Sequence, residues 1–93
     1  MSMDFYQIEQ GFAYGEPNAI PLARITMRTL NNGAIAIDHT YVSPSLRGQG
    51  IARKLVLLVV EVARKEGRLI APLCSYARVV LQGDENLKDL IAP

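Results

Sequence analysis

The stretch SPSLRGQGIARKL, residues 43–55, joins a segment of β character to a segment of helical periodicity. Gly48 and Gly50 stand at this junction, and glycine loses more backbone freedom on folding than any other residue. A glycine-rich turn from a strand into a helix can be a tight connection only, or it can hold an anion on its backbone amides. The charges of Arg47, Arg53 and Lys54 favour an anion, and the residues alone leave both interpretations open.

The residues on either side of this loop predict an α/β fold with a mixed sheet, in the order β-β-β-α-β-α. Alternating apolar residues and turn residues predict the strands, and apolar residues at helical spacing predict the helix after the loop. We expect Gly67 to end that helix in the left-handed conformation. The strand–helix–strand unit over residues 34–74 predicts a right-handed crossover with parallel strands. The expected strands are Phe12–Gly15, Pro21–Leu30, Ala34–Val42 and Leu69–Cys74, and the expected helices are Gly50–Glu66, Tyr76–Leu81 and a short segment Glu85–Ile91.

The composition argues against several classes of protein. A chain of 93 residues, 49% hydrophobic and 20% charged, predicts a single domain over residues 1–93. Its net charge of +1 predicts neither nucleic acid nor a membrane surface as a partner, and the apolar run Leu55–Val60 is too short to span a bilayer. The first ten residues lack the features of a signal peptide, and one cysteine permits no internal disulfide, so we expect a cytoplasmic protein. One histidine and one cysteine predict no metal site.

The loop also carries a family resemblance. Residues 47–52, RGQGIA, match the R/Q-x-x-G-x-G/A signature of the GNAT acetyltransferase superfamily. The run HTYVSPSLRGQGIARKL, followed by PLCSYA, resembles the small single-domain GNAT-like group over about residues 34–91. The resemblance implies a minimal GNAT-like fold and an N-acetyltransferase that moves an acetyl group from acetyl-coenzyme A (acetyl-CoA) to an unidentified amine.

The resemblance further implies where acetyl-CoA binds. The loop amides would hold the pyrophosphate, and the end of the strand before the loop would pair with the pantetheine arm. The strand that ends at Cys74 would diverge from that strand and open a V for the thioester, and the helix from near Tyr76 would flank the pantetheine. The predicted cofactor-binding residues are Thr40, Tyr41, Val42, Arg47, Gly48, Gln49, Gly50, Ile51, Ala52 and Arg53.

Three residues are candidates for catalysis. Cys74 precedes a predicted helix, where a thiol pKa can be lowered, and the resemblance suggests it as an acetyl acceptor; it can equally be a buried small hydrophobe. His39 can be a general base or a structural strand histidine. Tyr76 can protonate the departing coenzyme A thiolate, as the family resemblance implies, or be a packed aromatic residue.

One departure from the family leaves the acceptor open. A full GNAT has two helices between its first strands, whereas residues 15–21 leave room only for a turn. The acceptor can be a small molecule or a protein, or it can be bound by a dimer partner, and the chain can be a monomer or a homodimer. The alternative function is a non-catalytic coenzyme A or acyl-CoA-binding module, or a protein-interaction module. Leu57 lies among charged helix positions, either as a scattered surface leucine or as a partner contact.

Overall fold

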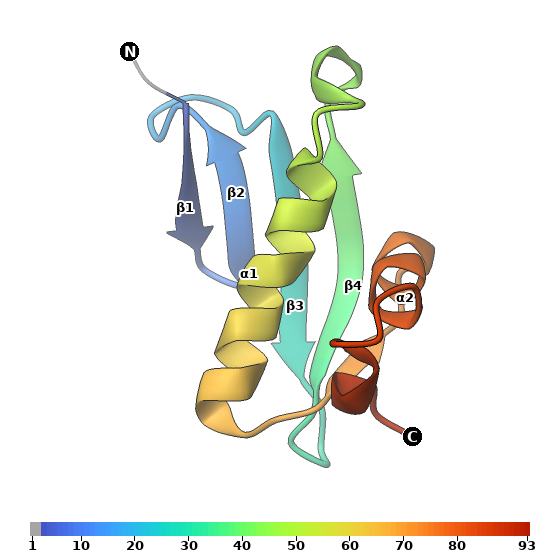
Figure 1. Ribbon diagram of the computed structural model, residues 1–93. Coiled ribbons are helices and arrows are strands. Elements are labelled where there is room, and N and C mark those ends of the chain that lie inside the picture. The colour runs from blue at the N-terminus through green and yellow to red at the C-terminus, as the bar shows by residue number, and fades with distance from the viewer. Residues whose placement is uncertain (1–2) are drawn as a thin grey trace.

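A computed structural model describes residues 3–93, so residues 1 and 2 of the predicted domain lie outside the described part. A five-stranded sheet has the order β1-β2-β3-β4-β5, in which β1 to β4 are antiparallel and β5 is parallel to β4. Helix α1 lies across one face of the sheet, and α2 lies beside β4 on the side away from β3 (Figure 1). The elements are β1 (Asp4–Ile8), β2 (Gly11–Gly15), β3 (Ala23–Thr29), β4 (Ile35–Val42), α1 (Ile51–Glu66), β5 (Ile70–Pro72), α2 (Ser75–Gln82) and the 3-10 turns η1 (Pro44–Leu46) and η2 (Lys88–Leu90).

The predicted mixed sheet and the parallel crossover are confirmed, with three differences. The sequence interpretation missed β1, whose ladder partner is β2. The predicted strand Leu69–Cys74 is shorter and ends at Pro72. The predicted short helical segment Glu85–Ile91 is reduced to the 3-10 turn η2, because the Asp84 carboxylate accepts a hydrogen bond from the Asn86 N–H at 2.9 Å and makes a turn before it.

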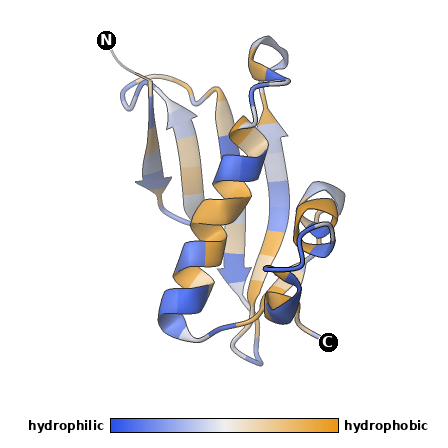
Figure 2. Ribbon diagram, in the orientation of Figure 1, coloured by the Kyte–Doolittle hydropathy of each residue, from blue (hydrophilic) through white to orange (hydrophobic). Residues whose placement is uncertain are grey.

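The core lies between the sheet and α1, and it also takes in α2 and η2. The middle of α1 is apolar and its C-terminal end is hydrophilic (Figure 2). The helix ends as predicted, because Gly67 has φ 65° and donates its N–H to carbonyls of the last turn. Among residues 3–93, no helix has the length and the apolar character that a membrane span requires. The largest fully buried side chains are Ile25, Ile35, Ile37, Leu55, Ile70, Leu81, Val56 and Val59.

A β-bulge divides β4 into two parts. Thr26 pairs with His39 and Met27 with Ile37, so Asp38 is the extra residue. In a regular strand, residues three positions apart face opposite sides of the sheet. Because Asp38 is an extra residue, Ile37, which lies in the core beside α1, and Thr40 are both on the α1 side. Thr26 Oγ1 donates a 2.6 Å hydrogen bond to Asp38, and this bond is the main reason why the pKa of Asp38 lies below its ordinary value despite partial burial.

Candidate functional site

The sheet opens between β4 and β5. The two strands pair only over Ile35–Ile37 and Ile70–Pro72. The Ile37 carbonyl then accepts hydrogen bonds from the N–H groups of both Leu73, at 3.0 Å, and Cys74, at 3.1 Å. Beyond this point no described strand pairs with β4 on that side, so residues 38–42 present a free backbone edge. The expected divergence of a strand ending at Cys74 is therefore not what opens the edge: all three residues of β5 pair with β4, and β4 continues past the point where β5 ends at Pro72.

A pocket of about 450 Å³ lies at this opening. It is bounded by the second half of β4, by the loop after it, by the first turn of α1 and by α2. Segments that are distant in sequence thus share one cavity. The lining residues are Thr40, Val42, Leu46, Arg47, Gly48, Gly50, Ile51, Ala52 and Tyr76.

The first turn of α1 forms the polar end of the pocket. Gly50 is the N-cap with φ 74°, and no side chain caps the helix. The first backbone hydrogen bond of the helix runs from Lys54 N–H to the Gly50 carbonyl at 3.1 Å, so the N–H groups before Lys54 in α1 have no partner among the described residues. No acidic residue lies in this turn. Unpaired amides and the positive end of the helix dipole make this a place for an anion.

The two glycines of the loop are required for their backbone conformation. Gly48 has φ 85° and Gly50 has φ 74°, values that disfavour residues with a side chain. A Cβ atom at either position would meet nothing within 4 Å, so no neighbouring atom fills the space next to the amides. Arg47 lines the same end of the pocket, and its side chain makes no hydrogen bond or ion pair within the described chain. Its guanidinium is therefore available to a bound anion.

Cys74 lies next to the pocket, at the N-cap position of α2. Its Sγ is 3.4 Å from Oγ1 of Thr40, which lines the pocket. Burial raises the pKa of the Cys74 thiol, but the hydrogen bond with the Thr40 side chain and the N–H groups of Ala77 and Tyr76 outweigh this effect, so the pKa lies below its ordinary value. A lowered pKa increases the fraction of nucleophilic thiolate at neutral pH.

Other predicted site residues lie outside the pocket. The exposed His39 pairs with Thr26, and the half-exposed Tyr41 lines a separate hollow that includes Arg24. Gln49 is exposed in the loop without lining the cavity. Arg53 of α1 binds Asp84, in the segment after α2, at 3.1 Å.

Sequence reasoning missed Leu46 as a wall of the pocket. The residue is half-buried in the 3-10 turn η1 and packs against the core. Ser43 begins this turn by accepting a hydrogen bond from the Ser45 N–H at 3.4 Å. The signal in the sequence was the motif Ser-Pro-Ser-Leu, since serine before proline favours a turn and a leucine in an exposed loop needs an apolar contact.

Comparison with known proteins agrees with this geometry. Residues 11–90 match the family model of the GCN5-related N-acetyl-transferase. The chain is similar to the solution structure of a GCN5-like candidate N-acetyltransferase from Staphylococcus aureus, with 38% identity, a TM-score of 0.81, and coverage of 96% of this chain and 87% of that one.

A crystal structure of ribosomal-protein-alanine N-acetyltransferase from Brucella melitensis biovar Abortus 2308 has 22% identity and a TM-score of 0.56. The match covers 94% of this chain and 66% of that one, and at this identity it shows the shared fold. The family match over residues 11–90 and the 38% identity to the Staphylococcus aureus protein show the family as well as the fold. The chain belongs to the GCN5-related N-acetyltransferase family and is an N-acetyltransferase.

Proposed function

We propose that the pocket binds acetyl-CoA, with its pyrophosphate on the N-terminus of α1, and that the chain transfers the acetyl group to an amine. The observation that carries the proposal is the coincidence of unpaired helix amides, an unpaired arginine and the free edge of β4 around one cavity. The amides and the Arg47 guanidinium suit the two negative charges of a pyrophosphate. The first turn of α1 contains no carboxylate that would repel them.

The free edge of β4 suits the pantetheine arm. This arm contains two amide groups, and an extended backbone edge offers N–H and C=O groups that can pair with them, as an added strand would. Thr40 and Val42 form the wall along this edge, and Tyr76 faces them from α2. The arm would therefore lead from the α1 end of the cavity toward Thr40 and the thiol beside it.

For the transfer step we propose a route through Cys74. The Cys74 thiolate attacks the thioester carbonyl carbon, a new carbon–sulfur bond forms, and the bond to the coenzyme A sulfur breaks. The departing thiolate takes a proton, for which the Tyr76 hydroxyl at the pocket wall is the proposed donor. The acceptor nitrogen then attacks the acetyl-Cys74 carbonyl and the Cys74 sulfur leaves as thiolate. The nitrogen loses a proton, for which the Tyr76 phenolate left by the first step is the proposed acceptor. The Thr40 hydroxyl can donate a hydrogen bond to that thiolate in both steps.

His39 keeps its predicted role as a base only if the acceptor meets it outside the pocket, since it does not line the cavity. The prediction is checked by the pH dependence of turnover in His39→Ala. A loss of the pH dependence of turnover in this variant supports the prediction, because a general base must be deprotonated before it can accept a proton. An unchanged profile removes His39 from the reaction.

Acetyl-CoA binding is tested by calorimetry with a matched pair of glycine variants. Gly48→Asp places a carboxylate at the anion end of the pocket, whereas Gly33→Asp places one in the β3–β4 turn. The two glycines have nearly equal φ, 85° and 88°, and a Cβ atom at either position would have no neighbour within 4 Å. We expect Gly48→Asp to weaken acetyl-CoA binding by about a hundredfold and Gly33→Asp to leave it unchanged. Equal affinities in the two variants, or no binding by the unaltered chain, would reject the proposal.

The route through Cys74 is tested by mass spectrometry of the intact protein after exposure to acetyl-CoA. We expect a single acetyl adduct on Cys74, and neither adduct nor turnover in Cys74→Ala. Full turnover in Cys74→Ala would instead show direct attack of the amine on the thioester. Binding without thiol release, for every amine tried, would favour the non-catalytic binding module.

A further inference from the structure

A second hollow region lies on α1, on the side that faces β1 and β2. It consists of two adjoining hollows of about 510 Å³ each, which share Leu58, Glu61 and Arg64. Phe5 of β1 and Leu57 line the first hollow, and Phe12 of β2 lines the second. We call this continuous surface the α1 groove. Its floor is apolar, and none of the pocket residues belongs to it.

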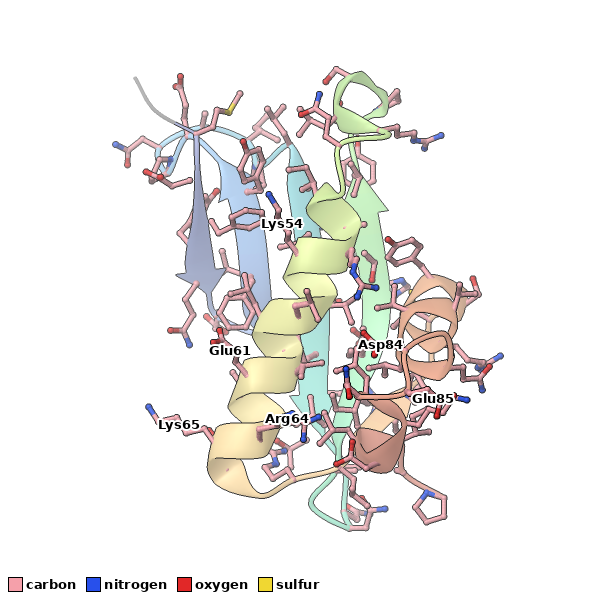
Figure 3. The ribbon with its side chains drawn as sticks, in the orientation of Figure 1. Lys54, Glu61, Arg64, Lys65, Asp84 and Glu85 are labelled. Atoms are coloured by element: carbon pink, nitrogen blue, oxygen red, sulfur yellow. The ribbon has the colours of Figure 1, made fainter. Side chains whose placement is uncertain are left out.

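Three charged side chains that line the α1 groove have no partner among residues 3–93: Lys54, Glu61 and Lys65. Lys54 and Glu61 extend from α1 toward the side of β1 and β2 (Figure 3). Neither of these two side chains makes an ion pair or a hydrogen bond among residues 3–93. Arg64 differs, because it binds Asp89 at 3.3 Å and also the Asn86 carbonyl. Lys54 and Glu61 thus lie on either side of Leu57 and Leu58, two helical turns or about 10 Å apart, and Lys65 lies one turn beyond Glu61.

The spacing of these charges is self-complementary. The midpoint between Lys54 and Glu61 in the sequence is also the midpoint between Leu57 and Leu58. We propose that the α1 groove is a dimer interface, on which α1 of a second copy packs antiparallel about a two-fold axis at this midpoint. Lys54 then lies opposite Glu61 of the second copy, Glu61 lies opposite its Lys54, and the leucines meet at the centre.

The pattern favours a second copy over another partner. A groove for an acidic peptide would carry unpaired cations only, and a groove for a basic peptide would carry unpaired anions only. Here Lys54 and Glu61, of opposite sign, lie at an equal distance from an apolar centre, which is what a two-fold axis requires of both subunits; the third unpaired charge, Lys65, lies nearer the C-terminal end of α1, outside this pair. Exposed ion pairs contribute little free energy, so most of the affinity comes from burying Leu57, Leu58 and Phe5. We therefore expect a weak dimer, with a dissociation constant on the order of 10 to 100 μM.

Charge reversal tests this arrangement, with sedimentation velocity on the full chain over a range of concentrations. Lys54→Glu alone and Glu61→Lys alone each place like charges opposite one another twice, and we expect each to weaken dimerisation about tenfold. An equimolar mixture of the two variants restores both attractions and should dimerise at least as well as the unaltered chain. The double variant Lys54→Glu/Glu61→Lys should do so as well.

Two controls keep the test decisive. Arg24→Glu makes the same change of net charge as Lys54→Glu, on β3 and outside the groove, and should leave dimerisation unchanged. Both reversed residues are exposed, so the variants should keep the circular dichroism spectrum of the unaltered chain. A monomer at about 1 mM, single reversals that dimerise like the unaltered chain, or a mixture that dimerises no better than either variant would each overturn the proposal.

Discussion

The two halves of β4 differ although they are adjacent in one strand. Ile35–Ile37 has a paired strand on each side and is buried. Residues 38–42 pair with β3 only, and they turn Thr40 and Val42 toward the pocket. One extra residue, Asp38, and the early end of β5 at Pro72 separate the halves. The first half of β4 stabilises the sheet because it has a strand on each side. The second half forms part of the pocket because it lacks a strand partner on one side.

The first half should dominate the stability of the fold. Ile37 is fully buried, and its replacement by alanine leaves a cavity between β4 and α1. We expect Ile37→Ala to lower the free energy of unfolding by about 2 to 4 kcal/mol, measured by urea denaturation. Val42→Ala, in the second half and only partly buried, serves as the control and should lower it by less. Equal losses of unfolding free energy in the two variants would contradict the expectation that the first half of β4 contributes more to stability than the second.

The second half should control thiol chemistry instead. Thr40→Val keeps the shape of the side chain and removes the hydroxyl that lies 3.4 Å from Cys74 Sγ. Because that hydrogen bond lowers the thiol pKa, its loss should raise the pKa and shift the rate of iodoacetamide alkylation to higher pH. Thr29→Val is the control, since Thr29 accepts its hydrogen bond from Arg68, at the other end of β3. If the pH profile of alkylation is the same in Thr40→Val as in the unaltered chain, the hydrogen bond between Thr40 and Cys74 does not lower the thiol pKa.

The bulge between the halves should have the smallest effect, and one that depends on pH. The pKa of Asp38 is lowered in the folded chain, chiefly by the hydrogen bond from Thr26. A carboxyl with a lowered folded pKa stabilises the fold above its unfolded pKa, about 3.9, and loses that contribution as pH falls through the folded pKa. We expect Asp38→Asn to lower the free energy of unfolding by about 1 kcal/mol or less at pH 7. The difference from the unaltered chain should shrink below about pH 4, measured by thermal melts; a constant difference would show that the ionised carboxylate is irrelevant.

Much of the fold could be predicted because the informative residues are close in sequence. The apolar spacing from Ile51 to Val62 and the left-handed Gly67 specify α1 within the chain itself. The loop motif lies directly before α1, so its position at the end of the pocket follows from the strand–loop–helix order. Tyr76 reaches the same pocket because α2 follows β5 after two residues.

The remaining features depend on contacts between distant residues. β1 has only partly buried and exposed residues, so Asp4–Ile8 shows little of the alternation that marks a strand. The bulge at Asp38 requires knowledge of the pairing with β3, and without it the faces of His39 and Thr40 cannot be assigned. Tyr41 likewise faces a hollow away from the pocket, although its neighbours Thr40 and Val42 line the pocket.

The double hydrogen bond at Ile37 has one more consequence. The Ile37 carbonyl accepts the N–H groups of Leu73 and Cys74, so the backbone of Cys74 is fixed to the sheet before α2 begins. Ordering one residue of backbone opposes folding by roughly 1 to 2 kcal/mol of conformational entropy at room temperature. That entropy is lost once, when the chain folds, and not at each encounter with a ligand. Cys74 is therefore preorganised beside the pocket. This preorganisation would accelerate a reaction of the thiol independently of its pKa.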